Sequence, residues 1–202
     1  MGLFVTGTGT DVGKTVVSAW LCLHQGFHYW KPIQTGSVEG TDTDFIHHLG
    51  VACYPEAYIF QGPLSPHTAA KLEQRTISID PILKQVPTHD QLLIEGAGGV
   101  LVPLNATHLM IDLIQRLKAP VIIVAHSGLG TLNHTLLTLE ALRARKIEPL
   151  GIILNGPSNP NNRDSLVFYG KTQVLAELPP LDQCTAASLL EIPLPESLKQ
   201  RL

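Results

Sequence analysis

The glycine-rich stretch near the amino terminus constrains the fold more than any other part of the 202-residue chain. A short apolar run, Leu3–Thr6, leads into a loop that begins at Gly7 and ends at Gly13, and a Lys-Thr pair then opens a helix-compatible segment. Glycines let the backbone N–H groups of such a loop curl around phosphate oxygens, where a Cβ would clash. The stretch therefore predicts a phosphate-binding loop, with Lys14 at the β- and γ-phosphates and Thr15 at a Mg²⁺ ion.

The spacing within this loop differs by one residue from the standard phosphate-loop pattern. Five residues separate Gly7 from Gly13, whereas the standard pattern has about four. A simpler alternative is a glycine turn that happens to precede a Lys-Thr pair. The apolar run before the loop, and the helix-compatible segment that follows it to about His24, favour the phosphate-binding interpretation.

Composition and charge argue against several other classes of protein. Hydrophobic residues make up 44% and charged residues 15% of the chain, which suits a compact α/β protein and argues against disorder. The formal net charge of −3 gives no basic footprint, so we expect no nucleic-acid partner. No apolar run approaches the roughly 20 residues of a membrane helix, so we expect no membrane partner. Three widely spaced cysteines without a C-x-x-C pair predict a cytoplasmic protein.

Apolar runs alternate along the chain with amphipathic stretches, which predicts one domain over residues 1–202. The apolar residues of these runs do not alternate with polar ones, as expected for strands that are buried on both faces of a parallel sheet. We therefore predict an α/β fold of the P-loop NTPase type, a mostly parallel sheet with helices on both faces. The predicted strands are Leu3–Thr6, Phe27–Ile33 (with Pro32 at its end or edge), Gln91–Glu95, Val121–Ala125, Leu150–Leu154 and Gln173–Leu178. The predicted helices are Lys14–His24, Thr43–Leu49, His67–Leu72, Ile79–Val86, Leu109–Leu117, Leu132–Arg145 and Arg163–Tyr169.

Residues that directly follow the apolar runs are candidates for the site, because parallel sheets bind ligands at the carboxyl ends of their strands. Glu95 follows one run, at the position where a P-loop protein keeps a second Mg²⁺ carboxylate. Asp44 lies in a polar turn and is expected to supply another oxygen ligand, although a helix cap is the simpler interpretation. Lys31 lies at the end of the second run, where a solvated lysine is the simpler interpretation when the residue is taken alone.

A series of short motifs is jointly specific, although each motif alone is weak. They are Val5-Thr6-Gly7-Thr8 with the long loop to Gly13-Lys14-Thr15, Lys31-Pro32 with Thr35-Gly36, Pro63-Leu64-Ser65-Pro66-His67, Ile94-Glu95-Gly96-Ala97-Gly98-Gly99, Leu129-Gly130-Thr131-Leu132-Asn133-His134, and Gly151 to Asn155. Together they resemble the dethiobiotin synthases of biotin biosynthesis, from Val5 to about Leu181. The unusual loop spacing looks like that family's own version of the phosphate loop.

The resemblance implies a ligase that uses ATP and Mg²⁺ to close a ring. Its expected substrates are 7,8-diaminononanoate and CO2. One amine is carboxylated to a carbamate, ATP phosphorylates the carbamate, and the second amine closes the cyclic urea and expels phosphate. The carbamate is an anion that must lie against the γ-phosphate, so cations must neutralise both. The resemblance also implies a homodimer, with the substrate carboxylate bound across the interface at a helix start.

The functional residues of that family map onto this sequence motif by motif. The catalytic positions are Lys31 (at the carbamate), Lys14 and Thr10. The substrate-binding positions are Thr35, Leu129, Gly130 and Asn133. The metal positions are Thr15, Asp44 and Glu95. The nucleotide-binding positions are Asp11, Val12, Gly13, Lys14, Thr15, Val16, Asp44, Glu95, Gly96, Ala97, Gly98, Asn155 (at the adenine edge), Gly156, Pro179, Pro180 and Leu181.

Three features depart from the family pattern. Asp11 stands where Glu is expected, Gly156 stands where family members can carry Asp, and no acid lies at the expected spacing beyond Leu181. These departures imply that the site discriminates only weakly between adenine and other nucleotide bases. The triphosphate site does not depend on them.

Two other functions are compatible with parts of this pattern. A regulatory P-loop switch ATPase of the partitioning type would share the fold and the dimer. Such a switch carries a lysine near the start of its loop, which this chain lacks, and it gives no role to Lys31-Pro32 or Ser65-Pro66-His67. The second alternative is a related ligase for another diamine or acid, because apolar pocket walls specify chain length weakly.

Overall fold

A sheet of seven parallel strands lies at the centre of the computed structural model, which describes residues 2–202. The strand order is β4-β2-β6-β1-β7-β8-β9, and every pair in it is parallel. The strands are β1 (Leu3–Gly7), β2 (His28–Trp30), β4 (Cys53–Tyr54), β6 (Leu92–Gly99), β7 (Val121–His126), β8 (Gly151–Asn155) and β9 (Val174–Leu178). The predicted parallel α/β fold is therefore confirmed.

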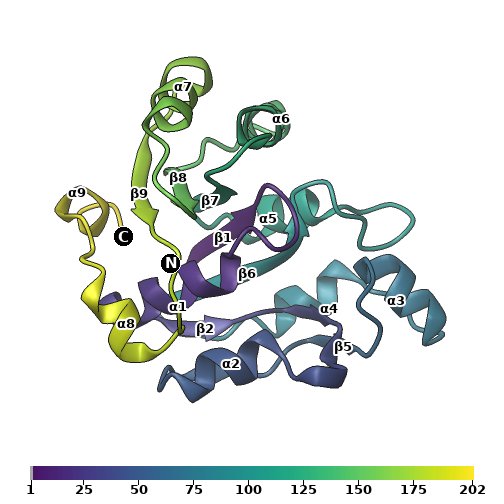
Figure 1. The fold of residues 1–202 in the computed structure, drawn as a ribbon. Coiled ribbons are helices and arrows are strands. Elements are labelled where there is room, and N and C mark those ends of the chain that lie inside the picture. The colour runs from purple at the N-terminus through teal and green to yellow at the C-terminus, as the bar shows by residue number, and fades with distance from the viewer. Residues whose placement is uncertain (1) are drawn as a thin grey trace.

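Helices cover both faces of this sheet and divide the core in two (Figure 1). In β7, Ile123 packs into one half of the core, whereas Ile122 and Val124 pack into the other. The first half is covered by α3 (Pro66–Leu72), α4 (Ile79–Lys84), α5 (Met110–Leu117), α6 (Thr131–Ala144) and α7 (Pro160–Gly170). The second half is covered by α1 (Lys14–Gln25), α2 (Asp42–His48), α8 (Ala186–Glu191) and α9 (Glu196–Lys199). Burial on both sides explains why most residues of these strands are apolar without alternation.

The predicted strand Phe27–Ile33 is wrong in one respect, because the chain leaves the main sheet at Lys31-Pro32. After β2, a second strand, β3 (Ile33–Thr35), pairs in parallel with β5 (Tyr58–Phe60) in a separate two-stranded sheet. Proline has no N–H to donate to a ladder, so the main sheet ends there. The carbonyl of Pro32 instead accepts from the N–H groups of Ala57 and Tyr58, both at 3.0 Å. A single 3₁₀ turn, η1 (Ser37–Glu39), follows β3.

The last part of the chain forms two helices that the sequence did not predict. Figure 1 shows α8, in yellow, beside α1, in purple, and the two helices are in contact. The indole Nε1 of Trp20 donates to the carbonyl of Ile192 at 2.9 Å, and the side chains of Leu189 and Leu198 are fully buried. The segment is thus part of the core. Within residues 2–202, no helix has the length and apolar character needed to cross a bilayer.

We predict that Leu189→Ala lowers the free energy of unfolding by about 2–5 kcal/mol, because it leaves a cavity between α8 and α1. The adjacent Leu190 is 49% exposed, so Leu190→Ala serves as the control and should change that free energy by about 0.5 kcal/mol or less. Chemical denaturation of both variants measures the difference. Equal losses would show that α8 does not contribute its buried leucine to the core.

Candidate nucleotide and metal site

The glycine-rich loop connects β1 to α1 at the carboxyl edge of the sheet. Gly13 caps α1 with a φ of 90°, and Asp11 also has a positive φ, of 57°. A Cβ on Gly13 would lie 2.1 Å from Nδ2 of Asn155, so both the backbone angle and the space require glycine there. Among the described residues, no side chain caps the first turn of α1. Its N–H groups are therefore available to an anion.

Lys14 folds back over this loop. Its Nζ donates to the carbonyl of Gly9 at 2.9 Å, and only 7% of the residue is exposed. Burial lowers the pKa of the ammonium group, and the carboxylate of Glu95 offsets this effect only in part. Lys14 thus lies over the loop, which is the place expected of a lysine that binds phosphate there.

Glu95 is the centre of a buried polar cluster. It lies on β6 between β1 and β2, and 0% of the residue is exposed. The hydroxyl of Thr15 donates to Oε1 at 3.0 Å, and the hydroxyl of Ser18 donates to Oε2 at 2.8 Å. A carboxylate without contact to water needs such partners, because burying an unpaired charge is costly. The parallel register places this carboxylate beside the start of α1.

Lys31 joins the same cluster from the end of β2. Trp30, the last residue of β2, pairs with Ile94 on β6. The residues that follow this pair along the chain are Lys31 and Glu95, which places them side by side. The Nζ of Lys31 lies 3.4 Å from Oε1 of Glu95 and also forms an ion pair with Asp42. Burial alone would lower the pKa of Lys31, but the two carboxylates raise it above its ordinary value. Lys31 is 6% exposed, so the interpretation as a solvated lysine is wrong.

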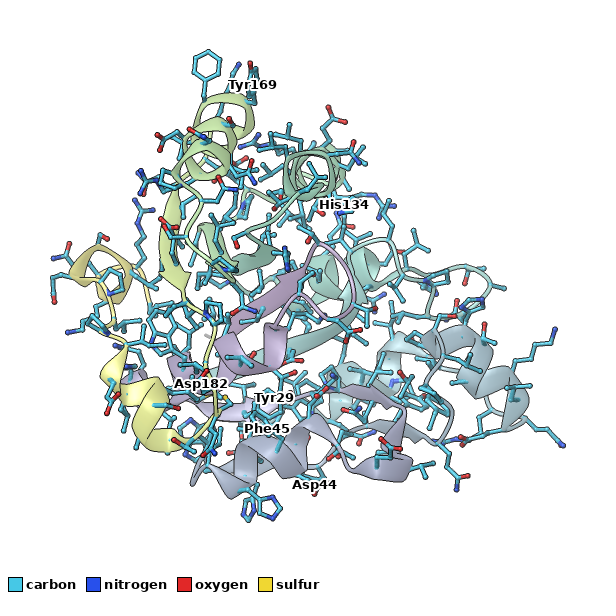
Figure 2. All side chains as sticks on the ribbon, in the orientation of Figure 1. Tyr29, Asp44, Phe45, His134, Tyr169 and Asp182 are labelled. Atoms are coloured by element: carbon cyan, nitrogen blue, oxygen red, sulfur yellow. The ribbon has the colours of Figure 1, made fainter. Side chains whose placement is uncertain are left out.

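The structure places Asp44 away from this cluster and Asp42 within it. The carboxylate of Asp44 accepts from the N–H of Thr41 at 3.0 Å and from its hydroxyl at 2.8 Å, as the third residue of a capping box. These bonds hold the pKa of Asp44 below its usual value. Figure 2 shows Asp44 on the outer side of α2. Asp44 therefore lies outside this cluster, whereas Asp42, about 200° around the helix from it, lies within it, and the capping interpretation of Asp44 agrees with the structure.

A cavity of about 740 Å³ opens beside this cluster and gathers half of the predicted site residues. Its lining comes from the loop and helix that follow β1, from Lys31 after β2, from the end of β3, from the segment after β5, and from β6 and the loop that follows it. The lining residues are Thr10, Asp11, Gly13, Lys14, Thr15, Val16, Lys31, Thr35, Pro63, Leu64, Ser65, Pro66, Glu95, Ala97, Gly98 and Val102. Three of the predicted loop and metal positions lie outside this lining. They are Val12 and Gly96, which are buried, and Asp44, which is exposed.

The predicted base-contacting residues lie at the ends of β8 and β9. Asn155 is fixed against the glycine-rich loop, since its Nδ2 donates to the carbonyl of Val12 at 3.3 Å. The N–H of Gly156 donates to the carbonyl of Leu178 at 2.9 Å, and Pro179 follows that strand. Pro180 and Leu181 line a separate hollow of about 530 Å³. The carboxylates of Asp182 and Glu191 also line it, at spacings that the family pattern did not predict.

The remaining predicted substrate residues do not line the 740 Å³ cavity. Leu129 is fully exposed, Gly130 caps α6 with a φ of 92°, and Asn133 is exposed on the first turn of that helix. A second hollow of about 390 Å³ lies next to them, lined in part by Gly9, His134 and Val102. Figure 2 shows His134 on the side of α6 that faces the glycine-rich loop. Val102 lines both hollows, so they adjoin.

Sequence reasoning missed two members of the buried cluster. Asp42 precedes the predicted helix start by one residue, and the capping box Thr41-x-x-Asp44 was the signal that fixes where α2 begins. Ser18 lies three residues after Thr15, which is the spacing that puts two side chains on the same face of a helix. Together the cluster contains two hydroxyls, two carboxylates and an ammonium group around one edge of the cavity. Oxygen donors of this kind are the ligands that Mg²⁺ takes.

Comparison with known proteins identifies close relatives. A family model described as an AAA domain matches residues 1–188. The "ATP-dependent dethiobiotin synthetase BioD" of Lawsonia intracellularis is 52% identical over 99% of this chain and 98% of its own length. The protein of the same name from Paramagnetospirillum magneticum is 51% identical over 96% and 95%. The septum site-determining protein MinD of Pyrococcus horikoshii, solved with Mg-ADP, has a TM-score of 0.56 at 16% identity, over 95% of this chain and 94% of MinD. The last likeness concerns the fold alone.

We predict that Asp42→Asn weakens Mg²⁺ binding at least about tenfold, because it removes one of two carboxylates from the cluster. Asp44→Asn is the matched control on the same helix, and its effect on Mg²⁺ affinity should stay within about twofold. Calorimetric titration of Mg²⁺ into protein saturated with a non-hydrolysable ATP analogue measures both. A larger loss in Asp44→Asn than in Asp42→Asn would reverse the assignment.

Proposed function

The chain belongs to the ATP-dependent dethiobiotin synthetases, and we propose how its residues divide the work of that reaction. The enzyme is an ATP- and Mg²⁺-dependent cyclo-ligase of biotin biosynthesis, which acts on small-molecule substrates. It converts 7,8-diaminononanoate, CO2 and ATP into the cyclic urea dethiobiotin, ADP and phosphate. The observation that carries the division of roles is the cavity in which Lys14, Thr15, Lys31 and Glu95 meet.

The metal residues of this proposal are Thr15, Glu95 and Asp42, with Asp42 in place of the expected Asp44. The donor set fits Mg²⁺, because it consists of one hydroxyl and two carboxylates that already share contacts. When bound, the ion neutralises charge on the β- and γ-phosphates. Lys14 and the N–H groups at the start of α1 hold the same phosphates from the other side. The further nucleotide contacts in this proposal are Asp11, Val12, Gly13, Val16, Gly96, Ala97, Gly98, Asn155, Gly156, Pro179, Pro180 and Leu181.

Lys31 is the proposed counter-ion of the carbamate. One amine attacks CO2 and loses a proton, which gives a carbamate anion, and an oxygen of that anion must then approach the γ-phosphate. Two anions repel each other, so a preorganised cation between them lowers the barrier. Lys31 is a buried ammonium group whose charged form its neighbours stabilise. Thr10 and Thr35 line the same cavity, where their hydroxyls can accept hydrogen bonds from the substrate amines.

The proposal extends to a homodimer that completes the substrate site. The start of α6 carries Leu129, Gly130 and Asn133 on the surface, and free N–H groups at a helix start suit the substrate carboxylate. Leu101 and Leu137 are also more than half exposed beside the 390 Å³ hollow. Exposed apolar side chains around a hollow favour an interface. Because that hollow adjoins the cavity, a second copy on this face would bring its own α6 close to the substrate.

The reaction itself is tested by incubating the protein with diaminononanoate, labelled bicarbonate and Mg-ATP. An acid-stable labelled urea is the expected product, because a cyclic urea survives acid and a carbamate does not. Absence of the labelled urea with this diamine would favour a related ligase with another substrate.

We also propose a cytoplasmic enzyme, since its three cysteines are free and suit a reducing compartment.

We predict that Lys31→Gln lowers turnover by about 10²–10³, the usual loss for one preorganised charge contact in a water-poor site. The affinity for ATP should stay nearly unchanged, because Lys31 comes from a different strand end than the phosphate loop. Lys84→Gln, at an exposed lysine of α4, is the control. Turnover assays and calorimetry with an ATP analogue provide the two measurements. Small and equal losses in both would remove Lys31 from the catalytic residues.

We predict that Leu137→Glu shifts the protein from dimer to monomer, because it puts a charge at the apolar face beside α6. Leu72 on α3 is also exposed, at 69%, and lies outside both hollows, so Leu72→Glu is the matched control and should leave the dimer intact. Sedimentation velocity of the two variants and the unchanged protein gives the result. An unchanged protein that sediments as a monomer would contradict the dimer.

A further inference from the structure

Ser18 binds a different oxygen of Glu95 from the one that Thr15 and Lys31 contact. It lies on α1 one turn after Thr15, and 0% of the residue is exposed. Its Oγ donates to Oε2 of Glu95 at 2.8 Å. The hydroxyls of Thr15 and Ser18 therefore bind the two different oxygens of one carboxylate from consecutive turns of one helix.

The two oxygens of Glu95 have partners of different kinds. Oε1 contacts Thr15 and Lys31, and the proposed function assigns both groups to other partners during the reaction, the metal and the carbamate. The hydrogen bond that Oε2 accepts among residues 2–202 comes from Ser18. The Ser18 bond is thus the contact of this carboxylate that can persist when the site is loaded.

Nothing within the Glu95 side chain itself fixes the plane of its carboxylate. The terminal torsion of glutamate is broad, with no strongly preferred angle, so hydrogen bonds from neighbouring groups must set the direction of the oxygens. The hydroxyl of Tyr29 is another buried neighbour; burial, the charge of Glu95 and the approach of its hydroxyl to that carboxylate raise its pKa, but the geometry of this approach is not that of a formed hydrogen bond. Ser18 is therefore the group placed to orient Glu95.

We propose that Ser18 is a positioning residue, which holds Oε2 of Glu95 so that Oε1 points toward the metal position beside Thr15. This proposal rests on the proposed function, because it assigns Glu95 to Mg²⁺. Ser18 touches neither substrate nor metal and acts through Glu95. Losing such a second contact of a metal ligand typically weakens metal binding by about 10- to 100-fold.

The test compares Ser18→Ala with Thr6→Val, which removes another buried hydroxyl, one that makes no hydrogen bond to a described residue. Calorimetry titrates Mg²⁺ into full-length protein that is saturated with a non-hydrolysable ATP analogue. Ser18→Ala should bind Mg²⁺ about 10- to 100-fold more weakly, with the KM for the diamine close to that of the unchanged protein and a lower unfolding midpoint, because Oε2 of Glu95 loses its donor. Thr6→Val should bind Mg²⁺ normally. A Mg²⁺ affinity of Ser18→Ala within about twofold of the unchanged protein would overturn the proposal.

Two further variants separate the possible failures. Glu95→Gln should weaken Mg²⁺ binding; if it does not, the metal assignment of Glu95 fails and the role of Ser18 fails with it. If Glu95→Gln weakens binding and Ser18→Ala does not, only the Ser18 proposal is overturned. Should Ser18→Ala not fold, Ser18→Cys decides, because a thiol keeps a weak donor in a similar volume. Its Mg²⁺ affinity should then lie below that of the unchanged protein, and a normal affinity would overturn the proposal.

Discussion

Burial of the Glu95 carboxylate is the interaction on which the rest of the site depends. An ionised group with no exposed surface in the middle of a sheet is stable only when its neighbours pair with it, because an unpaired buried charge costs several kcal/mol. Here the neighbours come from three different elements: α1 supplies two hydroxyls, the end of β2 supplies an ammonium, and α2 supplies the carboxylate that pairs with that ammonium. The start of α1, Lys31 and Asp42 are thereby fixed relative to one another.

Much of this arrangement follows from the sequence because the sheet is parallel. Apolar runs locate the strands, and parallel strands end at one edge, so Lys14, Thr15, Lys31 and Glu95 could be placed together without any knowledge of side-chain contacts. The glycine loop adds a second signal, since the positive φ of Gly13 matches the requirement that its position imposes. These inferences depend on strand order and direction, and both are robust to small errors in element ends.

The parts that the sequence did not predict depend on finer detail. A shift of two residues in a helix rotates a side chain by about 200°. The proposed metal position on α2 could therefore be chosen only if the first residue of this helix were known. The strand through Pro32 was predicted as continuous, because its apolar character does not reveal which sheet each half joins. The helices α8 and α9 are short, at six and four residues. They depend on contacts with distant parts of the chain, α8 with α1 and α9 with β9, which no local pattern reports.

The break at Pro32 has a mechanical consequence for Lys31. Trp30 belongs to the seven-stranded sheet and Ile33 to the two-stranded one, so the backbone of Lys31 bridges two bodies that share no ladder with each other. Hydrogen bonds from Ala57 and Tyr58 attach Pro32 to the smaller body. The main chain at Lys31 is therefore held from both sides, by the β2 ladder before it and by the bonds to Pro32 after it. The two sheets thus anchor the backbone of the lysine at both ends, which restricts where its ammonium group can reach.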